Sequence, residues 1–161
     1  MTGHKQIGIL QQREIEVGVI APIYQVLVER YGKEAARSVI EEAILADAEE
    51  AGREFARQAA PGKEMRHFID IQEYWEQDDA LETEHLEESD TGYAYNVYRC
   101  GYAEMYERLG VSELGTILSC GRDFAFARGY NPDLTLTRPQ TIMEGADHCP
   151  FQYRLLPGSA S

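Results

Sequence analysis

The chain has 161 residues, and its 28 acidic against 15 basic side chains give it a net charge of −13. This length fits one domain that buries about 68–70% of its unfolded surface, so the fold needs no disulfide or metal to hold it. The negative charge and the lack of a basic stripe argue against nucleic acid as a partner, because phosphate backbones are bound by clustered Lys and Arg. No apolar run approaches the ~20 residues of a membrane helix. Residues 1–12 also lack a signal-peptide core, so we expect a cytoplasmic protein without membrane contact.

The first half of the chain predicts helices. Apolar residues recur at helical spacing over residues 14–30, where Pro22 is expected to bend or restart the helix. A long Ala- and Glu-rich amphipathic helix is predicted over residues 33–60, and a shorter helix over residues 65–75. None of these segments carries obvious chemistry, so we expect them to form a layer that covers the rest of the fold.

After Asp79 the apolar period changes to that of strands. Two alternating segments flank a Ser-Asp-Thr-Gly turn, which predicts a hairpin. Ser112 is the expected N-cap of a later helix. The elements predicted in this half are strands 81–88, 93–100, 134–143 and 149–156 and helices 102–109 and 113–128.

The pattern as a whole predicts a single α+β domain over residues 1–161. Its N-terminal helices would pack on a C-terminal antiparallel sheet of about four strands, with two helices inserted between strands. Residues 1–12 and 158–161 are expected to be frayed tails. A homo-oligomer is compatible with this organisation.

Three cysteines, Cys100, Cys120 and Cys149, are the first candidates for chemistry. An odd number without a secretory signal favours free thiols or metal ligands over disulfides. Asp123 lies on the same helix face as Cys120, and His148 precedes Cys149. If the sheet is antiparallel, strand ends and helix faces would bring the three sulfurs together. The alternative is that each cysteine is a small buried hydrophobe.

A zinc site made by the three cysteines with His148 is chemically possible, but the scattered spacing without a close Cys pair gives it little support. Arg138 lies among Leu and Thr residues, where it either binds a substrate carboxylate through two parallel hydrogen bonds or extends to solvent. Tyr98 belongs to a tyrosine-rich strand that either lines a pocket or packs the sheet.

A series of short motifs spans nearly the whole chain. The motifs in chain order are Gln12-Arg13-Glu14-Ile15-Glu16, Arg99-Cys100-Gly101-Tyr102-Ala103, Leu109-Gly110, Glu113-Leu114-Gly115, Cys120-Gly121-Arg122-Asp123, Gly129-Tyr130-Asn131-Pro132, Arg138-Pro139-Gln140-Thr141 and Gly145-Ala146-Asp147-His148-Cys149-Pro150-Phe151. Taken together, they resemble the L-2-amino-thiazoline-4-carboxylic acid hydrolase family. Members often carry an acidic residue after the last cysteine, where this chain has Pro150. The closing Gly-x-x-x-Cys-x-Phe pattern is also similar to the end of 4-vinyl-reductase-type domains, which bind small molecules.

The resemblance implies hydrolytic opening of a small cyclic isothiourea such as L-2-amino-thiazoline-4-carboxylate, with no cofactor. Water would add at the carbon between nitrogen and sulfur, through an activated thiolate or a metal-bound hydroxide, and the residues do not choose between them. The catalytic candidates are Cys100, Cys120, Asp123, His148 and Cys149. The substrate-binding candidates are Arg138, Tyr98, Tyr130 and Asn131. The second likeness implies an alternative, a non-catalytic small-molecule-binding or sensory domain.

Overall fold

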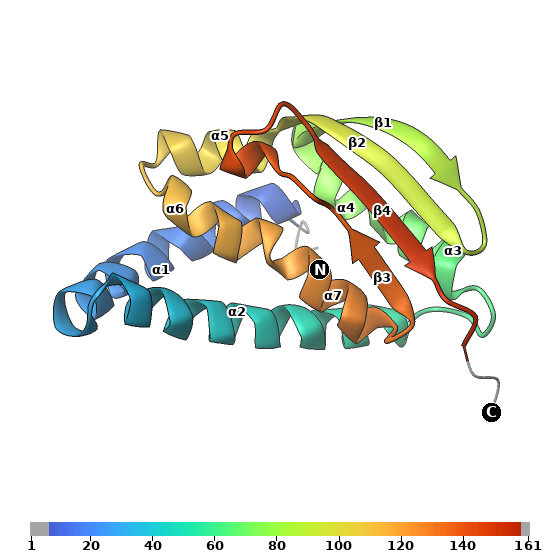
Figure 1. The fold of residues 1–161 in the computed structure, drawn as a ribbon, viewed down its shortest axis with the longest axis horizontal. Coiled ribbons are helices and arrows are strands. Elements are labelled where there is room, and N and C mark those ends of the chain that lie inside the picture. The colour runs from blue at the N-terminus through green and yellow to red at the C-terminus, as the bar shows by residue number, and fades with distance from the viewer. Residues whose placement is uncertain (1–6, 159–161) are drawn as a thin grey trace, which may run out of the picture.

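A computed structural model describes residues 7–158, and the chain begins with two long helices that meet at a sharp turn and diverge from it (Figure 1). Helix α1 (Ile9–Tyr31) continues through Pro22 without a restart, and helix α2 (Lys33–Ala56) follows after Gly32. Gly32 has a φ of +86°, a left-handed conformation that favours glycine. Residues 9–12 were predicted to be part of a tail but form the first turn of α1. Of the predicted tails, residues 1–6 and 159–161 lie outside the described residues.

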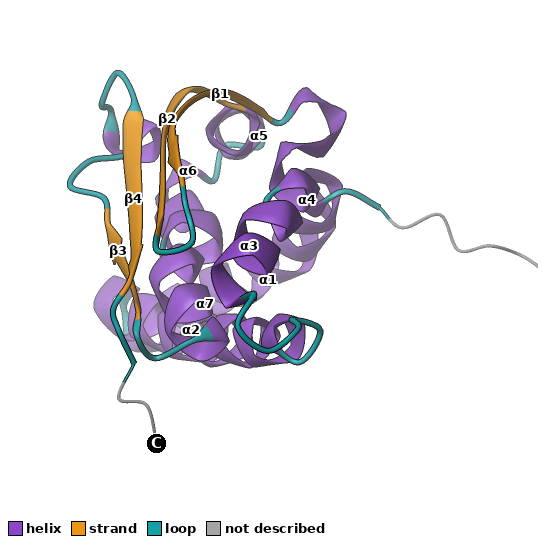
Figure 2. Ribbon diagram, turned by 90° about the vertical axis from the view of Figure 1, so that its right-hand side faces the viewer, coloured by secondary structure: helices purple, strands orange, loops and turns teal. Residues whose placement is uncertain are grey.

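The sheet has four antiparallel strands in the order β1-β2-β4-β3, which confirms the predicted α+β class. The strands are β1 (Leu81–Glu88), β2 (Gly92–Cys100), β3 (Leu134–Thr137) and β4 (Cys149–Leu155). The predicted hairpin joins β1 to β2, where the Ser89 amide donates to the Gly92 carbonyl at 2.8 Å. Figure 2 shows the sheet nearly edge on, with the N-terminal helices gathered on one side of it.

Two shorter helices, α3 (Glu64–Ile71) and α4 (Glu73–Glu76), connect α2 to the sheet. Between β2 and β3 the chain forms α5 (Gly101–Arg108), α6 (Ser112–Gly115), a π-helical turn (Thr116–Cys120) and α7 (Arg122–Tyr130). The helix predicted over residues 113–128 is therefore interrupted. Ser112 is not its N-cap: Val111 holds that position, with no side-chain hydrogen bond.

The strand predicted over residues 134–143 ends at Thr137. Pro139 has no amide proton to offer a neighbouring strand, and Arg138 turns towards α7 instead. Thr141 then accepts a hydrogen bond from the Glu144 amide and caps a short 3₁₀ turn (Ile142–Glu144).

Helices α2 and α7 cross in direct backbone contact. A Cβ atom at Gly129 would overlap the carbonyl group of Glu49, and one at Gly52 would overlap the carbonyl oxygen of Phe126. These two glycines let α7 approach α2 closely and so fix its position over the sheet. One cluster of buried side chains lies between α3, α7 and the sheet, and a second lies between α1, α2, α5 and the π-helical turn.

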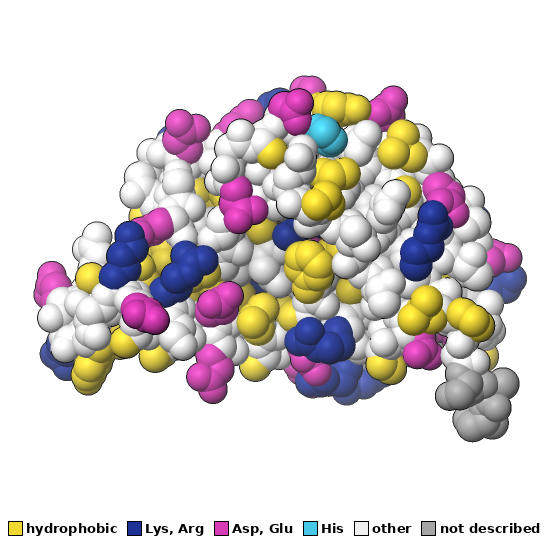
Figure 3. All heavy atoms as spheres, viewed as in Figure 1, with side chains coloured by type: hydrophobic (Ala, Val, Ile, Leu, Met, Phe, Trp, Pro, Cys, Tyr) yellow, Lys and Arg dark blue, Asp and Glu magenta, His cyan; other side chains and the backbone are white. Residues whose placement is uncertain are grey.

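Charged side chains are dispersed over the surface. On the face in Figure 3, the basic residues form separate groups rather than a continuous band. Among residues 7–158, no helix combines the length and the apolar character that a membrane span requires.

Candidate small-molecule site

A cavity of about 380 Å³ lies between the sheet and the helical layer. This volume falls in the range of about 300–1,000 Å³ that is typical of small-molecule sites. Its walls are rich in aromatic side chains, namely Phe55, Phe68, Trp75, Tyr95, Tyr102, Phe126, Phe151 and Tyr153. Such walls favour a flat ring, because aromatic faces stack with one another.

The period of the strands decides which side chains of the sheet reach the cavity. Cys149, Phe151 and Tyr153 alternate along β4 and share one face, so all three line it. Across the strand pair, the ring of Phe151 stacks on that of Tyr95, with centroids 4.7 Å apart and planes 9° from parallel. His148 and Pro150 alternate with these residues and do not line the cavity. The departure from the family pattern at Pro150 therefore leaves the cavity wall unchanged.

All three cysteines line this one cavity, so the structure brings together the sulfurs that the sequence had scattered. Each is a free thiol. The Cys100 sulfur accepts a hydrogen bond from the Ala103 amide at 3.4 Å, at the first turn of α5. The Cys149 sulfur accepts one from the Ile142 amide at 3.1 Å.

The thiols are held in their protonated form. Burial raises the pKa of Cys100 to about 11 and also raises the pKa values of Cys120 and Cys149. The negative charge of Asp123 raises all three pKa values further, whereas Arg138 lowers those of Cys120 and Cys149. A reactive cysteine normally has a lowered pKa, so none of the three is prepared as a nucleophile in this state.

Asp123 and Arg138 form an ion pair in the wall of the cavity. The Arg138 Nη1 group donates to Asp123 Oδ2, and Nη2 donates to the Cys120 carbonyl at 2.9 Å. The guanidinium carbon lies 5.0 Å from the ring centroid of Phe124 and 5.1 Å from that of Phe151. The side chain is 5% exposed, and its Nε is buried without a partner. Both terminal nitrogens are engaged within the protein, so Nε is the nitrogen of Arg138 that lacks a partner, and the role of Arg138 in binding a ligand carboxylate stays a prediction.

Asp123 combines a position in the cavity wall with a raised pKa. It lies in the first turn of α7 and lines the cavity, and 24% of its side chain is exposed. Burial raises the pKa of the Asp123 carboxyl above its ordinary value, and the charge of Arg138 opposes that rise. A carboxyl with a raised pKa in a ligand-sized cavity is a common feature of catalytic acids and bases.

The π-helical turn explains how Arg138 reaches the backbone of Cys120. The Gly121 amide donates to the Thr116 carbonyl at 2.7 Å, the longer reach of a π turn. Within this turn the Cys120 carbonyl accepts from Arg138. Single π turns of this kind occur frequently at functional sites.

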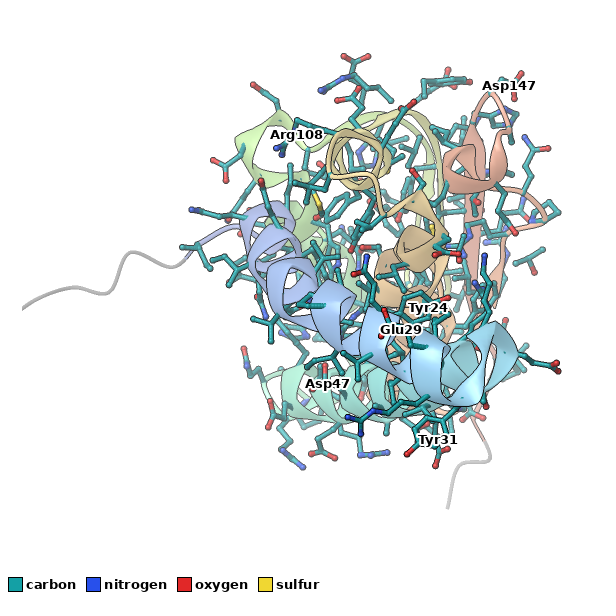
Figure 4. The ribbon with its side chains drawn as sticks, turned by 90° about the vertical axis from the view of Figure 1, so that its left-hand side faces the viewer. Tyr24, Glu29, Tyr31, Asp47, Arg108 and Asp147 are labelled. Carbon is teal, nitrogen blue, oxygen red and sulfur yellow. The ribbon has the colours of Figure 1, made fainter. Side chains whose placement is uncertain are left out.

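Two further arginines line the cavity and were given no role from the sequence. Arg13 donates to Glu16 at 2.8 Å, and Arg122 donates to Asp47 at 2.8 Å and to the Leu118 carbonyl at 2.9 Å. Asp47, labelled in Figure 4, belongs to α2. Arg13 shares the buried face of α1 with Val17 and Tyr24. The sequence signal that could have identified Arg13 is its helical spacing from the apolar residues Val17 and Tyr24, which places it on the buried face of the helix.

Two of the other predicted residues lie on the outer side of the sheet. Tyr98 is 53% exposed, and its hydroxyl donates to Glu84 at 2.9 Å. The His148 ring lies 5.8 Å from that of Tyr98 and pairs with Asp147 at 2.6 Å. Neither side chain lines the cavity, because strand alternation directs it to the opposite face.

Tyr130 and Asn131 lie at the C-terminal end of α7, away from the cavity lining. The buried Tyr130 hydroxyl donates to the Glu64 carbonyl at 2.8 Å and lies 2.7 Å from His67 Nδ1. Asn131 Oδ1 accepts from the Asp133 amide at 2.8 Å. These contacts join the end of α7 to α3 and to the turn before β3, so both residues stabilise the fold around the cavity.

Over the described part of the chain, no three His, Cys, Asp or Glu side chains are arranged to hold a metal ion. The suggested set of three cysteines and His148 does not form such a group, since His148 lies on the outer face of the sheet.

A helical layer packed on an antiparallel sheet, with a ligand-sized cavity between them, defines an α+β domain. The family model of L-2-amino-thiazoline-4-carboxylic acid hydrolase matches residues 12–153, and the chain belongs to this family. No curated protein matches the sequence significantly.

Solved structures provide more distant comparisons. The phenol-responsive sensory domain of the transcription activator PoxR, crystallised with phenol, is 10% identical, with a TM-score of 0.53 over 86% of this chain and 73% of that chain. This likeness shows a shared fold. Trafficking protein particle complex subunit 3 from Naegleria fowleri, covalently bound to palmitic acid, is 12% identical, with a TM-score of 0.49 over 91% of this chain and 96% of that chain.

Proposed function

We propose that this protein is a hydrolase that opens a small cyclic amidine or isothiourea, the class to which L-2-amino-thiazoline-4-carboxylate belongs. The observation that carries the proposal is Asp123, a partly buried carboxyl of raised pKa that lines a ligand-sized cavity. Membership of the hydrolase family supports the same reaction class.

In the proposed reaction, Asp123 acts as a general base. Its carboxylate takes a proton from water while the water oxygen bonds to the ring carbon between nitrogen and sulfur. Asp123 gives this proton to the ring nitrogen as the carbon–nitrogen double bond becomes a single bond. The same carboxylate then takes the proton of the new hydroxyl group and passes it to that nitrogen, while the carbonyl forms and the ring carbon–nitrogen bond breaks. The product is an open-chain thiocarbamate with a free amine. Arg138 is a positioning residue in this scheme, because it holds the Asp123 carboxylate through an ion pair.

The ion pairs of the cavity arginines determine how a substrate carboxylate can be bound. Arg13, Arg122 and Arg138 each already bind a carboxylate of the protein, in Glu16, Asp47 and Asp123 respectively. This leaves no unpaired arginine among the described lining residues to hold a substrate carboxylate. We therefore expect the ring, stacked against aromatic walls such as Phe151, to contribute more to affinity than the carboxylate does.

The test is product formation with a panel of 2-aminothiazolines with and without the carboxylate. Asp123→Asn should abolish turnover while ligand binding, read as a rise in melting temperature, persists. Asp70→Asn, at an exposed position on α3, is the matched control and should keep full turnover.

The cysteines separate this scheme from thiolate catalysis. If water is the nucleophile, Cys100→Ala, Cys120→Ala and Cys149→Ala should each retain turnover, because the raised pKa values keep these thiols protonated. A folded variant that binds ligand but loses all turnover would instead identify that cysteine as the nucleophile. The position of the cleaved bond is read from the product, since cleavage of the carbon–sulfur bond would release a free thiol.

The aromatic walls favour a second candidate, a small-molecule-binding or sensory domain without catalysis. Such a domain would show ligand-dependent stabilisation without product, worth about 2.7 kcal/mol at a ligand concentration of 100 Kd. Binding of neutral aromatic molecules together with failure to turn over any 2-aminothiazoline would favour this function.

A further inference from the structure

The outer face of α1 carries a continuous stripe without a charged residue. It consists of Ile15, Gly18, Val19, Pro22, Ile23 and Val26, all exposed, and we call it the α1 stripe. Its large members are 46–62% exposed. The spacing of three and four residues places them on one face over three turns, opposite the buried Val17 and Tyr24. In Figure 4 this helix lies in front of the rest of the molecule, and no described element crosses over it.

An uncharged stripe of this length is unexpected on a chain with a net charge of −13. Single exposed apolar residues are normal, but contiguous ones mark interaction surfaces. A Cβ atom built at Gly18 would have no neighbour within 4 Å, so the surface at Gly18 is open. The stripe therefore offers apolar side chains and, at Gly18, room for a side chain of another helix.

We propose that a second copy of this chain covers the α1 stripe, through antiparallel pairing of the two α1 helices about a two-fold axis. Such an axis places the N-terminal end of the stripe of one copy against the C-terminal end of the stripe of the other copy. Ile15 then faces Val26 of the second copy, and Val19 faces its Pro22. Ile23 faces Gly18, whose missing side chain leaves room for it.

The residues that flank the stripe also fit this arrangement. At the two ends, Gln11 and Gln12 of one copy face Arg30 and Glu29 of the other, and all four are exposed. Amide groups can pair with either charge, so the ends close with polar contacts. Parallel pairing would instead set Arg30 against Arg30 and Glu29 against Glu29. A second copy in antiparallel orientation thus satisfies the apolar centre and the polar ends together.

The stripe is smaller than a standard interface, which takes about 20–30 residues from each partner. We therefore expect a reversible dimer that forms in the micromolar range. The contact would not cover the catalytic candidates, because the stripe lies on the face of α1 opposite Arg13, which lines the cavity.

Sedimentation equilibrium of the full chain across the micromolar range tests the dimer. Val19→Glu places two carboxylates near the axis and should weaken dimerisation at least about tenfold, because like charges brought together are costly. Leu86→Glu is the control: Leu86 is 58% exposed on β1, outside the stripe, and the variant should dimerise as the wild type does. Melting temperatures show that both variants are folded. A wild-type chain that stays monomeric, or two variants that weaken the dimer equally, would overturn the proposal.

Cross-linking tests the orientation. In the antiparallel pair, the two Ile15 side chains lie about 16 Å apart along the helix axes at 1.5 Å per residue, whereas Ile15 faces Val26 directly. A thiol-specific cross-linker of short reach should therefore join Ile15→Cys to Val26→Cys in a mixture, but not Ile15→Cys to itself. The reverse result would show parallel pairing and contradict the proposed arrangement.

Discussion

The buried pair of Arg138 and Asp123 gives a sharp prediction about stability. Arg138→Met removes the guanidinium and leaves Asp123 without its counter-charge at a site where the arginine was 5% exposed. Removal of one partner of a buried ion pair costs about 3–5 kcal/mol, because the other charge stays uncompensated. The contacts of the guanidinium with the Cys120 carbonyl and the Phe151 ring are lost as well.

The double variant Arg138→Met/Asp123→Leu should recover most of this loss, since an apolar replacement of both partners is often neutral. Arg138→Lys keeps the charge but loses one of the two terminal hydrogen bonds, which contribute about 1.5–3 kcal/mol each when charged. Arg138→Lys should therefore be less stable than the wild type, because both terminal nitrogens of Arg138 are engaged within the protein.

Urea unfolding of the wild type, Arg138→Met, the double variant and Arg138→Lys measures their free energies of unfolding. Arg154→Met is the matched control, because Arg154 pairs with Glu87 at an exposed site and its loss should leave stability nearly unchanged. If Arg138→Met costs no more than Arg154→Met, or if the double variant is less stable than Arg138→Met, the buried-pair interpretation is wrong.

Three further predictions concern the contact between α7 and α2 and the titration of cavity residues. Gly129→Ala should destabilise the fold by roughly 1–3 kcal/mol in urea unfolding, because its Cβ would meet the backbone of Glu49. Gly18→Ala is the control and should not destabilise the fold, because a Cβ at this helical position has no neighbour. Alkylation of Cys100, followed by peptide mass spectrometry, should be slow at neutral pH and rise as the pH approaches about 11, and rapid modification at neutral pH would contradict the raised pKa. Turnover should increase with pH through the pKa of Asp123, with a midpoint above the ordinary value of 3.8, because the base acts in its ionised form; activity that falls over this window would exclude it as the base.

The pH dependence of stability carries the same sign. The folded-state pKa of Asp123 is raised, so the folded state binds this proton more tightly than the unfolded state does. The resulting stabilisation is complete below the unfolded value and is lost as the pH rises through the folded value. Wild type compared with Asp123→Asn should therefore lose relative stability in that direction.

Much of the fold follows from local patterns in the sequence. Alternation gave the bounds of β1, and the Ser89–Gly92 turn gave the hairpin, because both depend on neighbouring residues. The same period of two places Cys149 and Phe151 on one face and His148 on the other. The α+β class could be predicted from the sequence because these local patterns identify the helices and strands.

The contacts that define the site depend on residues far apart in the chain. Pro139 is a local sign that β3 ends early, but Arg138 and Asp123 are separated by 15 residues, and nothing local indicates that they pair. The π-helical turn of residues 116–120 is likewise invisible to helical periodicity, which predicts an uninterrupted helix. Tyr130 and Asn131 are part of a family-like motif, yet their partners are scaffold groups that only the tertiary structure identifies.

Mass spectrometry of 2-aminothiazoline hydrolysis in ¹⁸O-labelled water decides whether the cavity is catalytic. With wild-type protein we predict one labelled oxygen in an open-chain thiocarbamate, and with Asp123→Asn we predict bound ligand but no product. Ligand binding by the wild type without any labelled product across the panel would contradict hydrolysis at Asp123.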